Sequence, residues 1–160
     1  MLKVSAASVD VKNLSKCVVL FATKGATLAP ESAKFDKAHG GLVSKALKKS
    51  RFQGDAESTF SFATPSLDKV DSVVVVGLGE ADKLGTYTWR RACIVASQEV
   101  NKQFAAEATL VAENIKGDKT KELEVAKAIA EGFHMGVYKF DRFKTGQKPH
   151  QQVSLKKLTI

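Results

Sequence analysis

Two glycines directly after a run of valines are the first residues whose spacing suggests binding chemistry. Residues 73–80 read VVVVGLGE, and Gly77-Leu78-Gly79 starts like the glycine-rich turn that holds a dinucleotide. Asp82 stands where that motif has its third glycine, and no suitably placed helix start follows. We therefore interpret the segment as a plain turn between a strand and a helix.

Gly40 and Gly41 are a second candidate, here for phosphate binding. They precede a helical pattern that includes Leu42-Val43-Ser44, and glycines leading into a helix expose backbone N–H groups at its positive end. The same pair fits a C-cap that joins two short helices. Two glycines alone favour the junction, with the phosphate site as the alternative.

The remaining polar side chains form no recognisable catalytic or metal-binding pattern. His39, His134 and His150 are scattered, without HxxxH spacing or a carboxylate at ligand spacing. We expect His134 at the edge of the buried face of a helix. Glu122 and Glu124 fall near a helix N-terminus, where the helix dipole favours acids. Nucleophile motifs such as GxSxG are absent, so we predict no catalytic, cofactor-binding or metal-binding residue in this chain.

The two cysteines are predicted to be buried and reduced. Cys17 lies in an apolar run and Cys93 in a predicted helix, and neither has CxxC or CxxH spacing. A disulfide or a metal site is therefore disfavoured, and no redox chemistry is indicated.

The positive charge of the chain is concentrated near its C-terminal end. The formal net charge is +8, and residues 139–160 supply +5 of it. The charged residues of this segment are Lys139, Arg142, Lys144, Lys148, Lys156 and Lys157, with Asp141 as its acid. Such a segment can contact nucleic acid. A solvated linker or a face for another domain is the favoured interpretation, because no nucleic-acid motif accompanies the charge.

The length and composition predict one soluble, intracellular domain. A chain of 160 residues with 44% hydrophobic content can bury one real core. No apolar run approaches the roughly 20 residues that cross a bilayer, and the N-terminus lacks the apolar core of a signal peptide. We therefore expect no membrane contact and a cytoplasmic location.

These candidate residues must be positioned by alternating strands and helices. The continuous apolar runs at 73–77 and 17–23 predict strands buried on both faces, the first of them central in the sheet. Shorter strands are predicted at 2–6, 58–64, 108–112 and 153–160, the last of which can also start a further domain. The short link after Pro65 predicts that 58–64 runs antiparallel to the valine strand. Charged residues 116–120, around Gly117, are predicted to form a loop.

Two longer helices are predicted after the valine strand, in addition to two short ones that meet near Gly40 and Gly41. The first is capped by Thr86 or Thr88 and buries Trp89, Ala92, Cys93, Ala96, Val100 and Phe104. The second buries Leu123, Ala126, Ile129, Ala130, Phe133 and Val137. Gly132 and Gly136 lie within it, and each costs about 1 kcal/mol relative to Ala, which predicts close approach to a neighbouring element.

Residues 131–144, EGFHMGVYKFDRFK, closely resemble the segment that closes the N-terminal domain of the cytosol (leucyl) aminopeptidases. The matching positions are Glu131, Gly132, Gly136, Tyr138, Phe140, Asp141, Phe143 and Lys144, with Phe143 where the family often has Tyr. The segment with Asp36, Gly40, Gly41, Leu42, Phe52 and Gly54 resembles the family's early region. Val74–Gly79 resembles its Val-Gly-Leu-Gly turn.

The resemblance implies a three-layer α/β/α fold of the macro-domain type with a mixed, largely buried sheet. It implies that residues 1–148 are the N-terminal domain and that residues 149–160 are a linker or the start of the catalytic domain. In that family two divalent metals, zinc or manganese, bind a Lys, Asp and Glu cluster in a C-terminal domain with an Asn-Thr-Asp-Ala-Glu-Gly-Arg segment. That segment does not occur here, so the resemblance implies no cofactor in this chain.

Three functions remain open at this point. The leading hypothesis is a non-catalytic domain that serves hexamer assembly and the surroundings of the active sites of a leucyl aminopeptidase, with its own C-terminal catalytic domain as partner. The second is a stand-alone macro-like module that binds a phosphate-containing ligand such as ADP-ribose. The third is weak nucleic-acid binding through the basic tail or through Arg90 and Arg91.

Overall fold

The computed structural model describes residues 2–6, 14–113, 119–138 and 155–160. They form one seven-stranded sheet with the order β1-β7-β6-β2-β5-β4, and β3 pairs with the end of β2. The strands are β1 Lys3–Ser5, β2 Cys17–Thr23, β3 Thr27–Leu28, β4 Thr59–Ala63, β5 Ser72–Gly77, β6 Glu107–Leu110 and β7 Lys157–Thr159. Neighbours from β1 to β5 run parallel, whereas β4 runs antiparallel to β5 and β3 antiparallel to β2.

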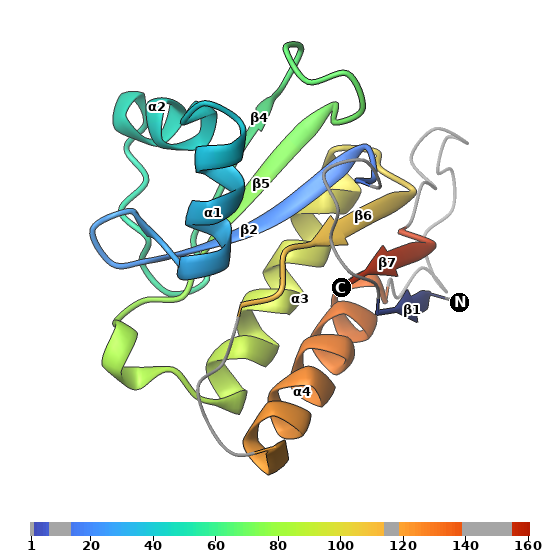
Figure 1. Cartoon of the computed structure of the whole chain (residues 1–160). Helices are drawn as coiled ribbons and strands as arrows, with labels where there is room; N and C mark the ends of the chain where they lie inside the picture. Colours follow the sequence, from blue (N-terminus) through green and yellow to red (C-terminus); the bar gives the residue numbers. More distant parts are fainter. Residues whose placement is uncertain (1, 7–13, 114–118, 139–154) are drawn as a thin grey trace, which may run out of the picture.

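The helices lie in two layers, one on each face of the sheet (Figure 1). Short helices α1, Pro30–Ala38, and α2, Leu42–Lys49, pack on one face. Long helices α3, Thr86–Lys102, and α4, Lys119–Val137, cover the other. A short 3-10 helix, η2, spans Ala81–Lys83 between β5 and α3. The predicted three-layer α/β/α fold with a mixed, largely buried sheet is confirmed.

Strand β2 shows how the sheet divides the core. Val18 and Leu20 belong to the cluster on the α1 and α2 face, while Val19 and Phe21 belong to the cluster beneath α3 and α4. Successive side chains of a strand point to opposite faces, so an uninterrupted apolar run serves both layers. β5 is buried on both faces in the same way. It lies beside the edge strand β4, however, and β2 lies nearer the centre of the sheet.

Helices α3 and α4 pack closely at the two glycines of α4. A Cβ atom on Gly132 would meet the Cys93 Cβ at 2.8 Å, and one on Gly136 would overlap the Ser97 hydroxyl and the Ile94 carbonyl. The close approach predicted from these glycines is confirmed.

The predicted start and end of α3 are wrong. Gly85 is the N-cap, in extended conformation without a side-chain cap, and Thr86 is the first helical residue. The Thr88 hydroxyl instead donates to the Lys83 carbonyl at 3.3 Å. At the other end the helix stops at Lys102, and Phe104 lies beyond it with 63% of its surface exposed.

The predicted buried face of α4 is also wrong in its first two turns. Leu123 and Ala126 are exposed, whereas Val125 and Ala128 are buried. The helix is rich in small and apolar residues, so two neighbouring stripes fit the 3.6-residue period, and contact with α3 selects the other one. Ile129 and Phe133 are buried as predicted.

Of the remaining predicted strands, β1, β4 and β6 are found within two residues of their predicted ends, whereas β7 begins at Lys157, four residues after its predicted start. β1, β4, β6 and β7 match the short strands expected at 2–6, 58–64, 108–112 and 153–160. β4 runs antiparallel to β5 as predicted. β3 was not predicted. Of the loop predicted at 116–120, residues 116–118 lie outside the described residues, and α4 begins at Lys119.

Candidate functional site

A crevice in the described part of the chain opens at the carboxyl ends of β2 and β5. Its volume is about 900 Å³. It is lined by Thr23, Thr27, Leu28, Ala29, Pro30, Leu78, Ala81, Leu84, Gly85, Thr86, Trp89, Glu113, Lys121, Glu124 and Val125. These residues come from the β2–β3 hairpin, the start of α1, the segment between β5 and α3, the first turn of α3, the segment after β6 and the first turns of α4.

The position of the crevice follows from the connections that leave β2 and β5. After β2 the chain enters α1 on one face of the sheet, and after β5 it enters α3 on the opposite face. The two connections leave neighbouring strands in opposite directions, which opens a gap at their carboxyl ends. Ligands of open α/β sheets bind at such switch points, so this crevice is the site that the fold itself favours.

The wall of the crevice is apolar and firmly packed. Trp89 is buried, and its ring meets Phe21 edge-on with 5.0 Å between the centroids. Leu78 is buried beside it, while Leu84 on the rim is 38% exposed. The crevice therefore offers apolar surface, with polar groups confined to particular positions on its lining.

Glu113 is the polar residue that the structure holds most firmly in the crevice. Its carboxylate accepts hydrogen bonds from the Glu31 N–H at 2.8 Å, the Ser32 N–H at 2.9 Å and the Ser32 hydroxyl at 2.6 Å. These are the free donors at the start of α1. A carboxylate of the chain itself thus occupies the place where a helix N-terminus would bind an anion.

The glycine pair at 40 and 41 is arranged in the same manner. Both glycines have positive φ, of 67° and 72°, and they join α1 to α2. The Asp36 carboxylate accepts from the Val43 N–H at 2.7 Å, from the Ser44 N–H at 3.2 Å and from the Ser44 hydroxyl. The favoured interpretation, a junction between two helices, is confirmed. Asp36 caps the start of α2, so the N–H groups of Val43 and Ser44 are already bonded and do not serve the alternative, a phosphate site.

Gly77 and Gly79 form a turn whose geometry requires glycine. A Cβ on Gly77 would overlap the Asp55 carbonyl, and Gly79 has a φ of 76°. The Gly79 N–H donates to the Gly54 carbonyl at 3.0 Å. Only η2 follows before α3 begins at Thr86, so no α-helix starts directly at these glycines. The interpretation as a turn between a strand and a helix is confirmed.

The histidines and the acids singled out in the sequence lie apart. His39 packs on Phe35, and its Nδ1 lies 2.8 Å from the Phe35 carbonyl. His134 is exposed, so its predicted place at the edge of the buried face is wrong, and His150 lies outside the described residues. Glu122 and Glu124 are exposed in the first turns of α4. Among the described residues no three His, Cys, Asp or Glu side chains gather as a metal site.

Both cysteines are free and buried, as predicted. Burial raises the pKa of the Cys17 thiol to about 11, against a smaller opposing effect of a hydrogen bond with Ser72. Burial also raises the pKa of the Cys93 thiol. A thiolate is the reactive form of cysteine, so neither residue is placed for nucleophilic chemistry.

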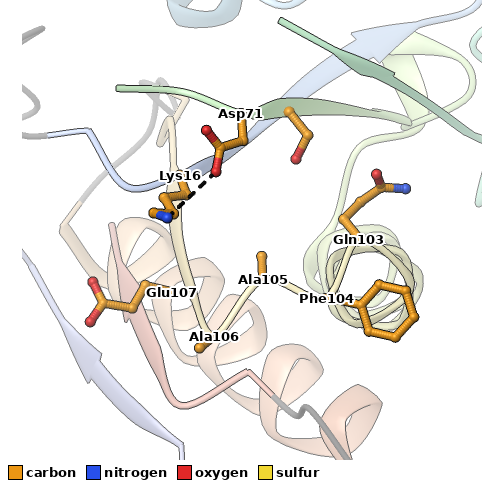
Figure 2. Close-up of a pocket in the computed structure, with 8 residues that line it drawn as sticks. Lys16, Asp71, Gln103, Phe104, Ala105, Ala106 and Glu107 are labelled. Atoms are coloured by element: carbon orange, nitrogen blue, oxygen red, sulfur yellow. Dashed lines mark ion pairs between the residues drawn. The ribbon is translucent and has the colours of Figure 1, made fainter. Parts of the chain in front are cut away.

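A second pocket lies at the amino ends of the strands, at the opposite end of the sheet from the crevice (Figure 2). Its volume is about 570 Å³, and it is lined by Lys16, Asp71, Ser72, Gln103, Phe104, Ala105, Ala106 and Glu107. Lys16 and Asp71 form an exposed ion pair at 3.8 Å. Figure 2 shows Gln103 and Phe104 at the end of α3, across the pocket from this pair. The lining contains no nucleophile paired with a base, and the exposed pair contributes little to binding or stability.

Sequence reasoning missed Glu113, whose carboxylate accepts three hydrogen bonds at the crevice. Its partners in α1 lie 81 and 82 residues earlier in the chain. Local patterns carry no signal for such a contact. Asp36 was noted only as part of the family resemblance, although its spacing of seven and eight residues to its partners is local.

The three layers of helices, sheet and helices, with a crevice at the carboxyl ends of the strands, define a macro-type α/β/α domain. The macrodomain of Mycobacterium tuberculosis DarG has a TM-score of 0.66 to this chain at 10% identity, covering 99% of this chain and 97% of the other. A tomato leucine aminopeptidase mutant has a TM-score of 0.76 at 18% identity, covering 100% of this chain and 32% of the other. Such low identities establish the fold alone.

The family follows from the sequence. Residues 18–147 match the model of the cytosol aminopeptidase family, N-terminal domain. The chain is 30% identical over 152 residues to a probable cytosol aminopeptidase of Aquifex aeolicus, covering 94% of this chain and 29% of the relative. The chain belongs to the cytosol aminopeptidase family and corresponds to its N-terminal domain, as the resemblance implied.

The match is confined to part of the relatives. A probable cytosol aminopeptidase of Rhizobium etli is 26% identical over 153 residues, which cover 96% of this chain and 30% of that protein. The chain thus spans less than a third of the length of these curated relatives. In the part of the chain that the structure describes, no helix is long and apolar enough to cross a membrane.

Proposed function

We propose that this chain is the non-catalytic N-terminal domain of a leucyl aminopeptidase. The parent enzyme hydrolyses N-terminal residues from peptides in the cytoplasm, with two divalent metals, zinc or manganese, in a C-terminal catalytic domain. The observation that carries the proposal is the match of residues 18–147 to the N-terminal domain of this family. The relatives named above are aminopeptidases more than three times as long as the matched region.

The proposed division of labour is consistent with the chemistry of the described residues. They contain no candidate metal cluster, and their most strongly held carboxylates, Asp36 and Glu113, cap helices of the domain. In this proposal the metal ligands lie in the catalytic domain, and residues 1–148 serve hexamer assembly and the surroundings of the active sites. Residues 149–160 are proposed to lead toward that domain, although β7, at 157–159, pairs within the sheet.

The coding sequence beyond codon 160 tests this proposal without any assay. We expect an open reading frame that contains an Asn-Thr-Asp-Ala-Glu-Gly-Arg segment or a close variant of it. A stop codon directly after Ile160 would contradict the proposal and would favour a stand-alone module.

A second candidate function is the binding of a phosphate-containing ligand in the crevice at the carboxyl ends of β2 and β5. The observation that favours it is the position of a crevice of about 900 Å³ at the switch point of a macro-type sheet. The Glu113 carboxylate opposes it, because it already fills the start of α1. A thermal shift titration with ADP-ribose tests whether the crevice binds such a ligand. We expect no rise in melting temperature, and a saturable rise would support the second function.

A third candidate, contact with nucleic acid, rests on the basic residues between 139 and 160. Most of them lie outside the described residues. Binding of this kind must weaken steeply as the salt concentration rises. Filter binding to duplex DNA at two salt concentrations tests it, and a salt-insensitive or undetectable interaction would rule it out.

A further inference from the structure

Strand β4 ends the sheet, and its five residues carry neither charge nor proline, although Glu57 and Pro65 lie just outside it. Its sequence, Thr59–Ala63, is TFSFA. Natural edge strands are commonly protected by charge, proline, a bulge or very short length. The opposite edge strand, β1, is three residues long and carries the exposed Lys3. Figure 1 shows β4 at the outer side of β5.

The register of β4 and β5 shows which backbone groups face outward. The Gly77 N–H donates to the Ser58 carbonyl at 2.8 Å, and the Thr64 N–H donates to the Asp71 carbonyl at 3.0 Å. With Thr59 opposite Val76 and Ala63 opposite Ser72, these bonds flank non-hydrogen-bonded pairs at both ends of the ladder. The N–H and C=O groups of Thr59, Ser61 and Ala63 therefore point away from β5.

The strand is held firmly on the face that meets α3. The Ser61 hydroxyl donates to Glu99 Oε1 at 2.8 Å, and Gln103 Nε2 donates to the Ser61 hydroxyl at 3.1 Å. Lys102 Nζ lies 2.9 Å from Glu99 Oε2 and completes this network. Ordering of the strand is therefore already achieved in the single chain, so a partner strand meets a preformed edge.

On the opposite face, the half-buried rings of Phe60 and Phe62 and the buried ring of Phe52 form a row. Phe60 and Phe62 stack with 5.5 Å between their centroids, and Phe52 lies 6.3 Å from Phe60. The row stops at β4, because this strand ends the sheet. A strand added at this edge would extend the row only if it carried apolar side chains at matching positions.

We propose that β4 is a homodimerisation edge at which two copies of this chain pair antiparallel about a two-fold axis through Ser61. In this register Ser61 faces Ser61 of the partner subunit, and the outward groups at 59 and 63 match one another across the axis. Every outward N–H then meets a carbonyl, which is the self-complementarity that a two-fold contact requires.

The side chains fit the same register. Phe60 of one copy lies opposite Phe62 of the other, on one face and at non-hydrogen-bonded positions, where cross-strand side chains are closest. Aromatic pairs at such positions stabilise a sheet. The five residues carry no charge, so two copies of a chain with net charge +8 meet here without like charges facing each other between the paired strands. The proposal rests on the geometry of β4 and is independent of peptidase activity in any longer protein.

Sedimentation velocity of the 160-residue chain between about 1 and 300 µM tests the proposal. We expect a reversible shift from monomer to dimer as concentration rises. Ala63→Pro removes an outward N–H from each copy without touching the β4–β5 ladder, so we expect about tenfold weaker association or more. Ala63→Val keeps this N–H at similar size, and its dimer should persist. A monomer at every concentration, a larger aggregate in place of a dimer, or an undiminished Ala63→Pro dimer would each overturn the proposal.

Residue-resolved hydrogen exchange on the unaltered chain provides a test that requires no variant. The amides of Thr59, Ser61 and Ala63 should exchange fast in dilute solution and slow down at high concentration. Those of Phe60 and Phe62 point toward β5 and should stay protected throughout, which makes them internal controls. Fast exchange at 59, 61 and 63 at all concentrations, or protection that is independent of concentration, would overturn the pairing.

Discussion

At the scale of single residues, two carboxylates do within the chain what an anionic ligand does at many helix starts. Glu113 caps α1, and Asp36 caps α2. Each satisfies backbone donors that no intrahelical carbonyl can reach. At Gly40 and Gly41 the cap by Asp36 explains why a glycine pair that looks like a phosphate site in the sequence is a structural joint between α1 and α2.

Replacing Glu113 tests the importance of such a cap. In Glu113→Gln one carboxylate oxygen becomes an NH₂ group that faces the donors of Glu31 and Ser32. We expect the free energy of unfolding to fall by about 1–2 kcal/mol, the usual cost of losing an N-cap. Urea denaturation measures the change, and Glu124→Gln, at an exposed position of the same crevice, is the control. Equal stability of the two variants would contradict the capping role.

Glu99 predicts a pH dependence with a defined sign. Burial alone would raise the pKa of Glu99, but hydrogen bonds from Lys102, Ser61 and Gln103 outweigh it and hold the pKa below its ordinary value. A carboxylate with a lowered folded-state pKa stabilises the fold above its unfolded pKa of about 4.3, and this contribution is lost as the pH falls through the folded value.

Comparing the unaltered chain with Glu99→Gln between pH 3 and 7 checks this sign. We expect the unaltered chain to be the more stable of the two at pH 6–7, with a difference that shrinks as the solution is acidified below about pH 4. A stability difference that is constant over this range, or that grows on acidification, would show that the ionised carboxylate is not what stabilises this position.

At the scale of elements, the contact between α3 and α4 depends on the absence of side chains at two positions. Gly132 and Gly136 let the backbone of α4 approach α3. A Cβ on Gly132 would overlap the Arg90 carbonyl, and one on Gly136 would overlap Ser97 and Ile94. The glycines lower the helical propensity of α4, and the close packing compensates for this loss.

Gly136→Ala distinguishes helix propensity from close packing, because the two predict opposite signs for the change in unfolding free energy. Propensity alone predicts a gain of about 1 kcal/mol in unfolding free energy. Overpacking against Ser97 and Ile94 predicts a net loss of about 1–3 kcal/mol, and we expect the loss. Thermal and urea unfolding measure it. The reverse exchange at an exposed position of the same helix, Ala126→Gly, should cost only about 1 kcal/mol. A stabilised Gly136→Ala variant would contradict the packing account.

How much the sequence predicts depends on whether the deciding interaction is local. The valine run of β5 and the apolar run of β2 identify buried strands because burial on both faces excludes alternation. The cap of α3 was misplaced at a threonine, because Gly85 supplies the extended N-cap without any side-chain bond. In α4, Leu123 and Val125 fit two equally periodic stripes, and only the packing on α3 selects Val125.

The candidate crevice was the part least accessible to sequence reasoning. Its lining comes from segments between Thr23 and Val125 that meet only through the strand order. The absence of a recognisable catalytic pattern could be noted from residue types, whereas the place of the crevice at a switch point required the topology. The family segment at 139–144 lies outside the described residues, so its resemblance rests on sequence.

At the scale of the whole molecule, the sheet separates two apolar cores that share the strands β2 and β5. The family match covers most of this one domain, and the domain covers less than a third of its relatives. The proposed role, a non-catalytic domain of a larger enzyme, rests on these two facts. In that account the domain folds with its own cores, and hydrolysis requires groups that it does not carry.

The assay of peptidase activity on the purified 160 residues tests this central claim most directly. Release of p-nitroaniline from leucine p-nitroanilide is followed with added zinc or manganese, with the metal alone as blank and a complete cytosol aminopeptidase as positive control. We predict no release above the blank at either metal. Sustained, metal-dependent turnover that copurifies with the chain would contradict the account, because it would place a complete active site within these residues.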